Sequence, residues 1–282
     1  MKKKVLLTSL IATAILSFIG CGSSGGSSYL PPENTTQTGN LVDAPIEGLK
    51  YTTPTHSGFT DANGKFEYEE GELVTFYLGN LPLATIPAKK LITPLTLAGD
   101  INLNSISTKA IAIARILQSL DSDQANPDTL IIPTNLAGMD ISALDLEVEA
   151  DLNTILAEAQ IITSQVYVLK DATTALNAMK DFLQSYLYNG SYTGSAQHTG
   201  GTLPICPPSM TFTISVSNGT NLSGITSEGD LLSAFNLINS TVSGTTSNNV
   251  VWNATINEDG GISGSYNYDN GKCMGTISGY KN

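Results

Sequence analysis

The residues from 188 to 282 alternate apolar and small polar side chains over short runs, and this pattern restricts the fold more than any other feature. Phe212, Ile214 and Val216 form one such run, and a period of two is typical of a strand with one buried face. Turn signals separate the runs at Asn218-Gly219, Glu258-Asp259-Gly260-Gly261 and Asn270-Gly271. Short strands joined by tight turns predict a small antiparallel β-barrel or β-sandwich over residues 188–282.

The N-terminus has the pattern of an export signal. Lys2, Lys3 and Lys4 precede an apolar run over residues 5–19 that is too short to span a bilayer. The run ends at Phe18-Ile19-Gly20-Cys21, which resembles the lipobox of bacterial lipoproteins. The resemblance implies that residues 1–20 are a signal peptide, and that Cys21 carries a diacylglycerol on its sulfur and an acyl group such as palmitate on its nitrogen. An ordinary signal peptide or a transmembrane helix is the alternative interpretation.

A tether follows the lipidated cysteine. Residues 21–40 are rich in Gly, Ser and Pro, a composition typical of flexible chain. Several acyl chains, each contributing about 0.8 kcal/mol per buried methylene, form a permanent anchor. Gly22 stands where an Asp would, by the same resemblance, favour retention in the inner membrane. We therefore expect a cell-envelope protein held on the outer membrane by its lipidated N-terminus.

Cys206 and Cys273 are the cysteines left after lipidation of Cys21. Exported proteins fold in an oxidising compartment, where two remaining cysteines most simply form a disulfide. Neither has the C-x-x-C spacing or the neighbouring histidine that is typical of a metal or redox site. We expect a Cys206–Cys273 disulfide that joins the two ends of the C-terminal β-domain and stabilises it by about 4 kcal/mol.

Residues 41–98 also predict short strands, because apolar and charged residues alternate over runs such as 65–69. The sequence Asp61-Ala62-Asn63-Gly64 predicts a hairpin, since Asn-Gly adopts the positive φ angles of a tight turn. The segments Val42–Tyr51, Thr60–Phe66 and Glu70–Phe76 resemble carboxypeptidase regulatory-like domains. The resemblance implies an N-terminal Ig-like β-sandwich that acts as a spacer or binding module and has no catalytic activity.

Residues 99–187 show the longer period of amphipathic helices. Ile106, Ala110 and Ile113 begin an apolar stripe, with Ser105 or Ser107 as the cap. A weaker stripe covers residues 142–163, and a clearer one runs from 172 to 187. We expect these helices to pack on each other and on the first β-domain. The whole sequence therefore predicts a mainly β protein with a helical middle segment.

The charge balance restricts the partners. The formal net charge is −12, and Arg115 is the sole arginine. Recognition of phosphate groups uses clustered guanidinium and ammonium groups, which the chain lacks once residues 1–20 are removed. We therefore expect no nucleic-acid partner and no peripheral binding to anionic lipid, and we interpret the acidity as a contribution to solubility.

Residue types that carry catalysis are sparse. The two histidines, His56 and His198, have no partner at metal-ligand spacing, and no Gly-x-Ser-x-Gly motif occurs. We expect no enzyme, no cofactor, no metal and no catalytic residue.

A cluster of three aspartates and one asparagine after the first predicted helix suggests a calcium-binding loop, because hard cations prefer oxygen ligands. Its members are Asp121, Asp123, Asn126 and Asp128. However, Ala125 and Ile132 occupy positions where an EF-hand loop supplies an oxygen. A capped helix end with solvated acids is the simpler interpretation.

Aromatic residues gather in the C-terminal domain, at Tyr188, Tyr192, Tyr266, Tyr268, Tyr280 and Trp252. Such residues either fill the core of a small β-domain or form a surface that binds sugars or proteins. We expect a non-enzymatic module that binds or displays, with a glycan or a surface protein as its partner. A calcium-dependent adhesin and a secreted hydrolase with an unrecognised site are the alternatives.

Overall fold

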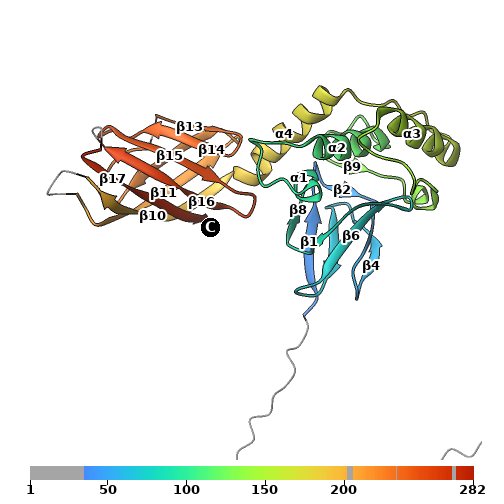
Figure 1. Cartoon of the computed structure of the whole chain (residues 1–282), viewed down its shortest axis with the longest axis horizontal. Helices are drawn as coiled ribbons and strands as arrows, with labels where there is room; N and C mark the ends of the chain where they lie inside the picture. The colour runs from blue at the N-terminus through green and yellow to red at the C-terminus, as the bar shows by residue number, and fades with distance from the viewer. Residues whose placement is uncertain (1–34, 202–205, 233, 269–270) are drawn as a thin grey trace, which may run out of the picture. The chain divides into compact units, whose positions relative to one another are not determined.

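The computed structural model describes residues 35–201, 206–232, 234–268 and 271–282 (Figure 1). Asn34–Asn282 forms one compact unit. The predicted signal peptide, the lipidation residue Cys21 and the tether up to residue 34 lie outside the described residues. Within the described ranges, no helix combines the length and the apolar character that crossing a membrane requires.

Two small β-sheets form the first part of the unit. One has the strand order β5 (Lys65–Tyr68), β1 (Gln37–Leu41) and β8 (Leu91–Ile92), and the other has the order β4 (Ser57–Phe59), β3 (Lys50–Thr52), β6 (Leu73–Leu78) and β7 (Leu81–Pro87). Aromatic side chains from both sheets share one core, in which the ring centroids of Phe66 and Phe76 lie 5.2 Å apart. The short strands are confirmed, whereas the Ig-like relationship stays a prediction.

The hairpin predicted at Asp61–Gly64 is wrong. A tight turn does form there, because the Gly64 N–H donates to the Asp61 carbonyl over 2.8 Å and Gly64 has a φ of 72°. However, β4 before the turn pairs with β3, and β5 after it pairs with β1. The turn therefore leads from one sheet to the other, which lets Phe66 pack against Tyr51 at a centroid distance of 5.8 Å.

Helices follow the sheets, at α1 (Pro94–Ala98), α2 (Thr108–Leu120), the 3-10 helix η1 (Thr134–Gly138), α3 (Glu149–Thr163) and α4 (Ala172–Tyr188). The Ser107 hydroxyl caps α2 by accepting the N–H of Ala110, which confirms one of the two predicted caps. The helical segment also contains a strand that the sequence did not predict. This strand, β9 (Leu130–Ile131), pairs in parallel with β2 (Ile46–Glu47) and ties the helices to the N-terminal strands.

The C-terminal part is a closed antiparallel β-barrel (Figure 1). Its strands are β10 (Gly190–Gly200), β11 (Ser209–Ser217), β12 (Asn221–Thr226), β13 (Ala234–Ile238), β14 (Thr241–Thr245), β15 (Val250–Ile256), β16 (Gly261–Tyr268) and β17 (Cys273–Lys281). Each strand pairs with the next one along the chain, and β17 pairs with β10 to close the ring. Of the two predicted architectures, the barrel is therefore the observed one.

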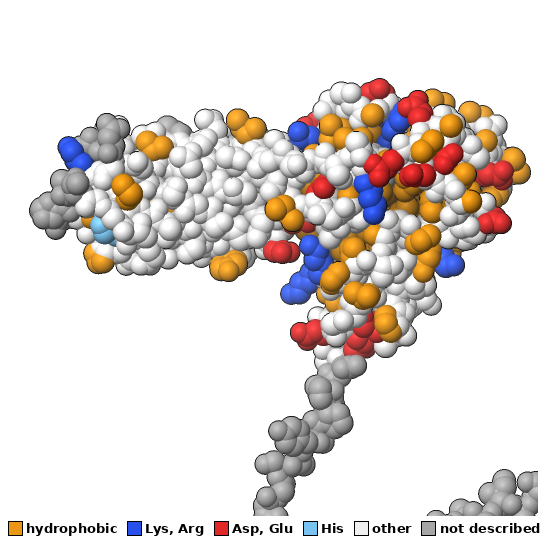
Figure 2. Space-filling view, in the orientation of Figure 1, with side chains coloured by type: hydrophobic (Ala, Val, Ile, Leu, Met, Phe, Trp, Pro, Cys, Tyr) orange, Lys and Arg blue, Asp and Glu red, His pale blue; other side chains and the backbone are white. Residues whose placement is uncertain are grey.

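Apolar side chains fill much of the barrel interior. Trp252 is 0% exposed and makes edge-to-face contacts with Phe212 at 5.2 Å and with Phe235 at 6.0 Å. Its neighbour Val251 points outward and is 42% exposed, as the period of two predicts. Figure 2 shows that the outer wall of the barrel carries few charged side chains in this view.

Candidate functional site at the barrel mouth

A cavity of about 580 Å³, here called the mouth cavity, opens at one end of the barrel. Its floor consists of inward-facing side chains near strand ends, namely Met210, Val250, Tyr266, Tyr268 and Cys273. Its rim comes from the connections between strands, with Pro207, Glu228, Asp230, Ser247, Asn248 and Asn249. An eight-stranded barrel is just wide enough to hold one small ligand, and the volume lies in the usual range for ligand sites.

Two hairpin loops of one design build most of the rim. Each loop spans five residues, 226–230 and 246–250, and begins with Thr-Ser. In each loop the first hydroxyl accepts the N–H of the fifth residue over 3.1 Å, Thr226 from Asp230 and Thr246 from Val250. The fourth residues, Gly229 and Asn249, have φ angles of 85° and 62°. Gly and Asn are the residues that adopt this left-handed conformation most readily, so local sequence determines both loops.

Side chains join the two loops to each other. The Ser247 hydroxyl accepts the N–H of Leu231 over 3.0 Å, and the Asn248 side-chain amide donates to Oδ1 of Asp230. Asp230 is 6% exposed. Its second carboxylate oxygen, Oδ2, has no hydrogen-bond partner among the described residues and is not sealed from solvent. The rim is therefore held by its own hydrogen bonds and leaves one carboxylate oxygen available.

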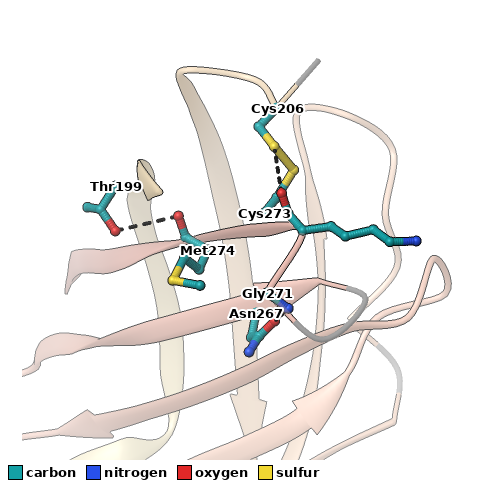
Figure 3. The surroundings of a disulfide bond; sticks show 7 residues. Thr199, Cys206, Asn267, Gly271, Cys273 and Met274 are labelled. Atoms are coloured by element: carbon teal, nitrogen blue, oxygen red, sulfur yellow. Dashed lines mark hydrogen bonds between the residues drawn. A yellow bond between two sulfur atoms is a disulfide. The ribbon is translucent and has the colours of Figure 1, made fainter. Parts of the chain in front are cut away.

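The Cys206–Cys273 disulfide lies at the same end of the barrel (Figure 3). The two Cα atoms are 5.8 Å apart, and Cys273 is the first residue of β17. Sγ of Cys206 contacts the Lys272 carbonyl oxygen at 3.4 Å, although a disulfide sulfur has no proton to donate. The bond fastens the segment that carries Pro207 to β17 and so fixes this side of the rim.

Acidic groups dominate the charge of the mouth cavity. Glu228 and Asp230 line it, and none of its described lining residues is Lys, Arg or His. Lys272 belongs to the connection before β17 and lies outside this lining. Burial raises the pKa of the Tyr266 hydroxyl, which keeps that group neutral. The cavity therefore favours ligands that carry hydrogen-bond donors or positive charge, and it disfavours anions.

The predicted calcium ligands lie in the loop after α2, where two of the side chains accept hydrogen bonds from the backbone. Oδ1 of Asp121 accepts the N–H of Asp123 over 3.0 Å and that of Ile131 over 2.9 Å. Oδ1 of Asn126 accepts the N–H of Asp128 over 3.0 Å. Two of the four side chains thus stabilise the turn after α2. Across the residues with described positions, no three His, Cys, Asp or Glu side chains are grouped to hold a metal ion.

The aromatic residues and histidines singled out from the sequence do not form one site. Tyr188, Tyr192 and Trp252 are buried, Tyr266 and Tyr268 line the mouth cavity, and Tyr280 is 73% exposed on β17. His56 lies between β3 and β4, where Nδ1 is 2.7 Å from the Thr55 hydroxyl, whereas His198 belongs to β10.

Sequence reasoning missed the rim of the mouth cavity. It identified no turn at Thr226–Asp230 or at Thr246–Val250, and it gave Asp230 no role. The repeated pattern of Thr-Ser followed by Gly or Asn two positions later could have located both loops. Their side-by-side placement depends on the pairing of β13 with β14, the two strands that lie between the loops.

Similarity to known proteins covers a limited part of the chain. The chain is 30% identical over 87 residues to "Putative lipoprotein YghJ" of Escherichia coli O78:H11 (strain H10407 / ETEC), and equally to "Putative lipoprotein AcfD homolog" of Escherichia coli strain K12. Each match covers 30% of this chain and 6% of the relative's length. No family model matches the chain. The similarity supports a bacterial lipoprotein of the cell envelope.

Proposed function

We propose that this chain is a lipoprotein anchored in the outer membrane, whose barrel is a non-enzymatic binding module. The observation that carries the proposal is the mouth cavity of about 580 Å³ with an apolar floor and a polar rim. Concave sites of this composition are the usual form of small-ligand sites. The hydrogen bonds between the rim loops hold the site in shape before a ligand arrives, which reduces the entropy cost of binding.

The chemistry of the rim supports binding rather than hydrolysis. Nucleophilic catalysis needs a hydroxyl or thiol beside a base. The rim serine, Ser247, uses its hydroxyl to accept the N–H of Leu231, and Cys273 is held in the disulfide. The described lining residues supply no histidine or lysine as a base. In this proposal the N-terminal sheets act as an Ig-like spacer between the tether and the barrel.

An array of glycans and peptides, incubated with the purified full chain, tests the proposal. We expect binding that is lost in Tyr268→Ala, because this side chain lines the mouth cavity. The matched control is Tyr280→Ala, which removes the same aromatic group from the outer surface of β17. Binding that survives Tyr268→Ala and is lost in Tyr280→Ala would move the site to the outer wall. Turnover of an ester, peptide or glycan substrate by the full chain would contradict the non-enzymatic role.

A further inference from the structure

We infer that the mouth cavity binds an organic ammonium group attached to an apolar body. In this assignment the carboxylates of Asp230 and Glu228 receive the charged group, and Tyr266 and Tyr268 contact the apolar body. The inference rests on the proposed function, because it names the chemical class of ligand for the same site.

The rim of the cavity carries a carboxylate, that of Asp230, with one oxygen left open. Asp230 is largely buried, and the protein supplies one side-chain donor, the Asn248 amide, to Oδ1. Oδ2 remains open to solvent, so a ligand that displaces water there must supply donors in its place. An ammonium group carries three donors and a positive charge, and charge-assisted hydrogen bonds are the strong ones. A ligand amine at Oδ2 therefore supplies what the rim lacks.

The floor beneath these acids combines aromatic and aliphatic side chains. Tyr266 and Tyr268 are successive inward-facing residues of β16, and Met210 and Val250 lie on the same floor. The faces of aromatic rings attract cations, and their combination with aliphatic side chains accepts the carbon chain next to an amine. An inorganic cation would make no use of this apolar surface.

The described lining of the cavity also provides no cation that would compete with a ligand. Lys89 pairs with Glu258 and Asp259, and Arg115 pairs with Glu149. Glu228 and Asp230 take part in none of these pairs. Anionic ligands would meet two carboxylates without a compensating positive charge in the described lining, so repulsion excludes them.

The methionines provide a direct test on the full chain in detergent. Met210 lines the cavity, whereas Met139 is buried in the other part of the core. With 13C-labelled methionine methyl groups, we expect n-butylammonium chloride to shift the Met210 resonance saturably and to leave the Met139 resonance unchanged. The neutral isostere n-butanol should bind about tenfold more weakly, because it lacks the charge. Butyrate should not bind.

Two variants identify the carboxylates. Asp230→Asn and Glu228→Gln should each weaken n-butylammonium binding, whereas the matched control Asp259→Asn should not, because Asp259 lies in the β15–β16 connection outside the lining. Glu228 is exposed and makes no described side-chain hydrogen bond, so Glu228→Gln keeps the test valid if Asp230→Asn fails to fold. The Met139 resonance reports whether each variant is folded.

A lysine side chain of a partner protein and a free small amine share this chemistry. Stronger binding of Nα-acetyl-lysine N-methylamide than of n-butylammonium would assign the lysine source, and the reverse order would assign the free amine. Equal binding of n-butanol and n-butylammonium, or unchanged binding in both carboxylate variants, would overturn the inference. A glycan or peptide that binds in a Tyr268-dependent manner would still support the proposed function in that case.

Discussion

Asp43 shows how a single buried group links the structure to pH. It is 4% exposed, and Oδ2 accepts a hydrogen bond of 2.9 Å from the Gln118 side-chain amide. Oδ1 of Asp43 and Oε1 of Gln118 are both buried without a described partner. Burial raises the pKa of the Asp43 carboxyl to about 7, and the Gln118 hydrogen bond and the charge of Lys170 offset part of this rise. The folded protein therefore favours a protonated Asp43.

The first prediction is that Asp43→Asn stabilises the protein at pH 8 and has little effect at pH 4. The unfolded Asp loses its proton near 3.8, and the folded one keeps it until about 7. The free energy of unfolding therefore falls between these values as pH rises, by about 4 kcal/mol for this group. Asn cannot ionise and so avoids that loss. Urea unfolding at both pH values measures the difference.

Asp123→Asn is the control for this experiment, because it makes the same substitution on the neighbouring loop after α2, where the side chain is exposed. Its effect on the free energy of unfolding should be small at both pH values. An Asp43→Asn effect that is equal at pH 4 and pH 8 would show that Asp43 is ionised throughout.

Strand β15 provides two adjacent residues with opposite environments. Trp252 fills the barrel interior between Phe212 and Phe235, and Val251 faces outward. We predict that Trp252→Ala lowers the free energy of unfolding by roughly 3–5 kcal/mol, because it leaves a large cavity. Val251→Ala should cost less than about 1 kcal/mol. Chemical denaturation followed by circular dichroism compares the two, and similar losses would contradict the strand's register.

The disulfide stabilises the barrel through its long loop. Cys206 and Cys273 are separated by 67 positions in the sequence, and the chain-entropy model assigns about 4 kcal/mol to a loop of this length. We predict a loss of that order in the double variant Cys206→Ser with Cys273→Ser, measured by urea unfolding. Reduction of the wild type should produce the same loss. If reduction left the free energy of unfolding unchanged, strand pairing alone would be sufficient to hold this end of the barrel together.

Local sequence predicted where strands and helices occur better than it predicted which strands pair with each other. The alternation of Phe212, Ile214 and Val216 located a strand, and Ser107 located a helix start, because both signals act within a few residues. The turn at Asp61–Gly64 was also local, but β4 before it pairs with β3 and β5 after it pairs with β1. This arrangement places Phe66 against Tyr51, a contact between residues distant in sequence that a turn signal cannot specify. The mouth cavity was missed for a related reason, since the pairing of β13 with β14 brings Asp230 and Asn248 together and no local signal marks that contact.

Charge is unevenly distributed over the face of the protein that Figure 2 shows. Figure 2 shows acidic and basic side chains mixed over the N-terminal part, whereas the visible barrel wall has few of either. A wall of this kind limits long-range electrostatic attraction and leaves the acids at the mouth as a local feature. Selection of a cationic ligand would therefore depend on the acids at the mouth rather than on the visible wall of the barrel, while the net charge of −12 attracts cations to the chain as a whole.

The last prediction concerns the attachment of the whole molecule to the membrane. Cells supplied with an alkyne-bearing palmitate should label the wild type but not Cys21→Ser, because Cys21 is the predicted acceptor of the lipid. The double variant Cys206→Ser with Cys273→Ser is the matched control and should label normally. Mass spectrometry should find an acylated Cys21 as the first residue of the mature chain. The acyl chains should hold the protein on membranes washed with high salt, since their burial is apolar and is not screened by ions. An unmodified Cys21 sulfur in protein from intact cells would refute lipid anchoring while leaving the ligand site of the barrel to be tested separately.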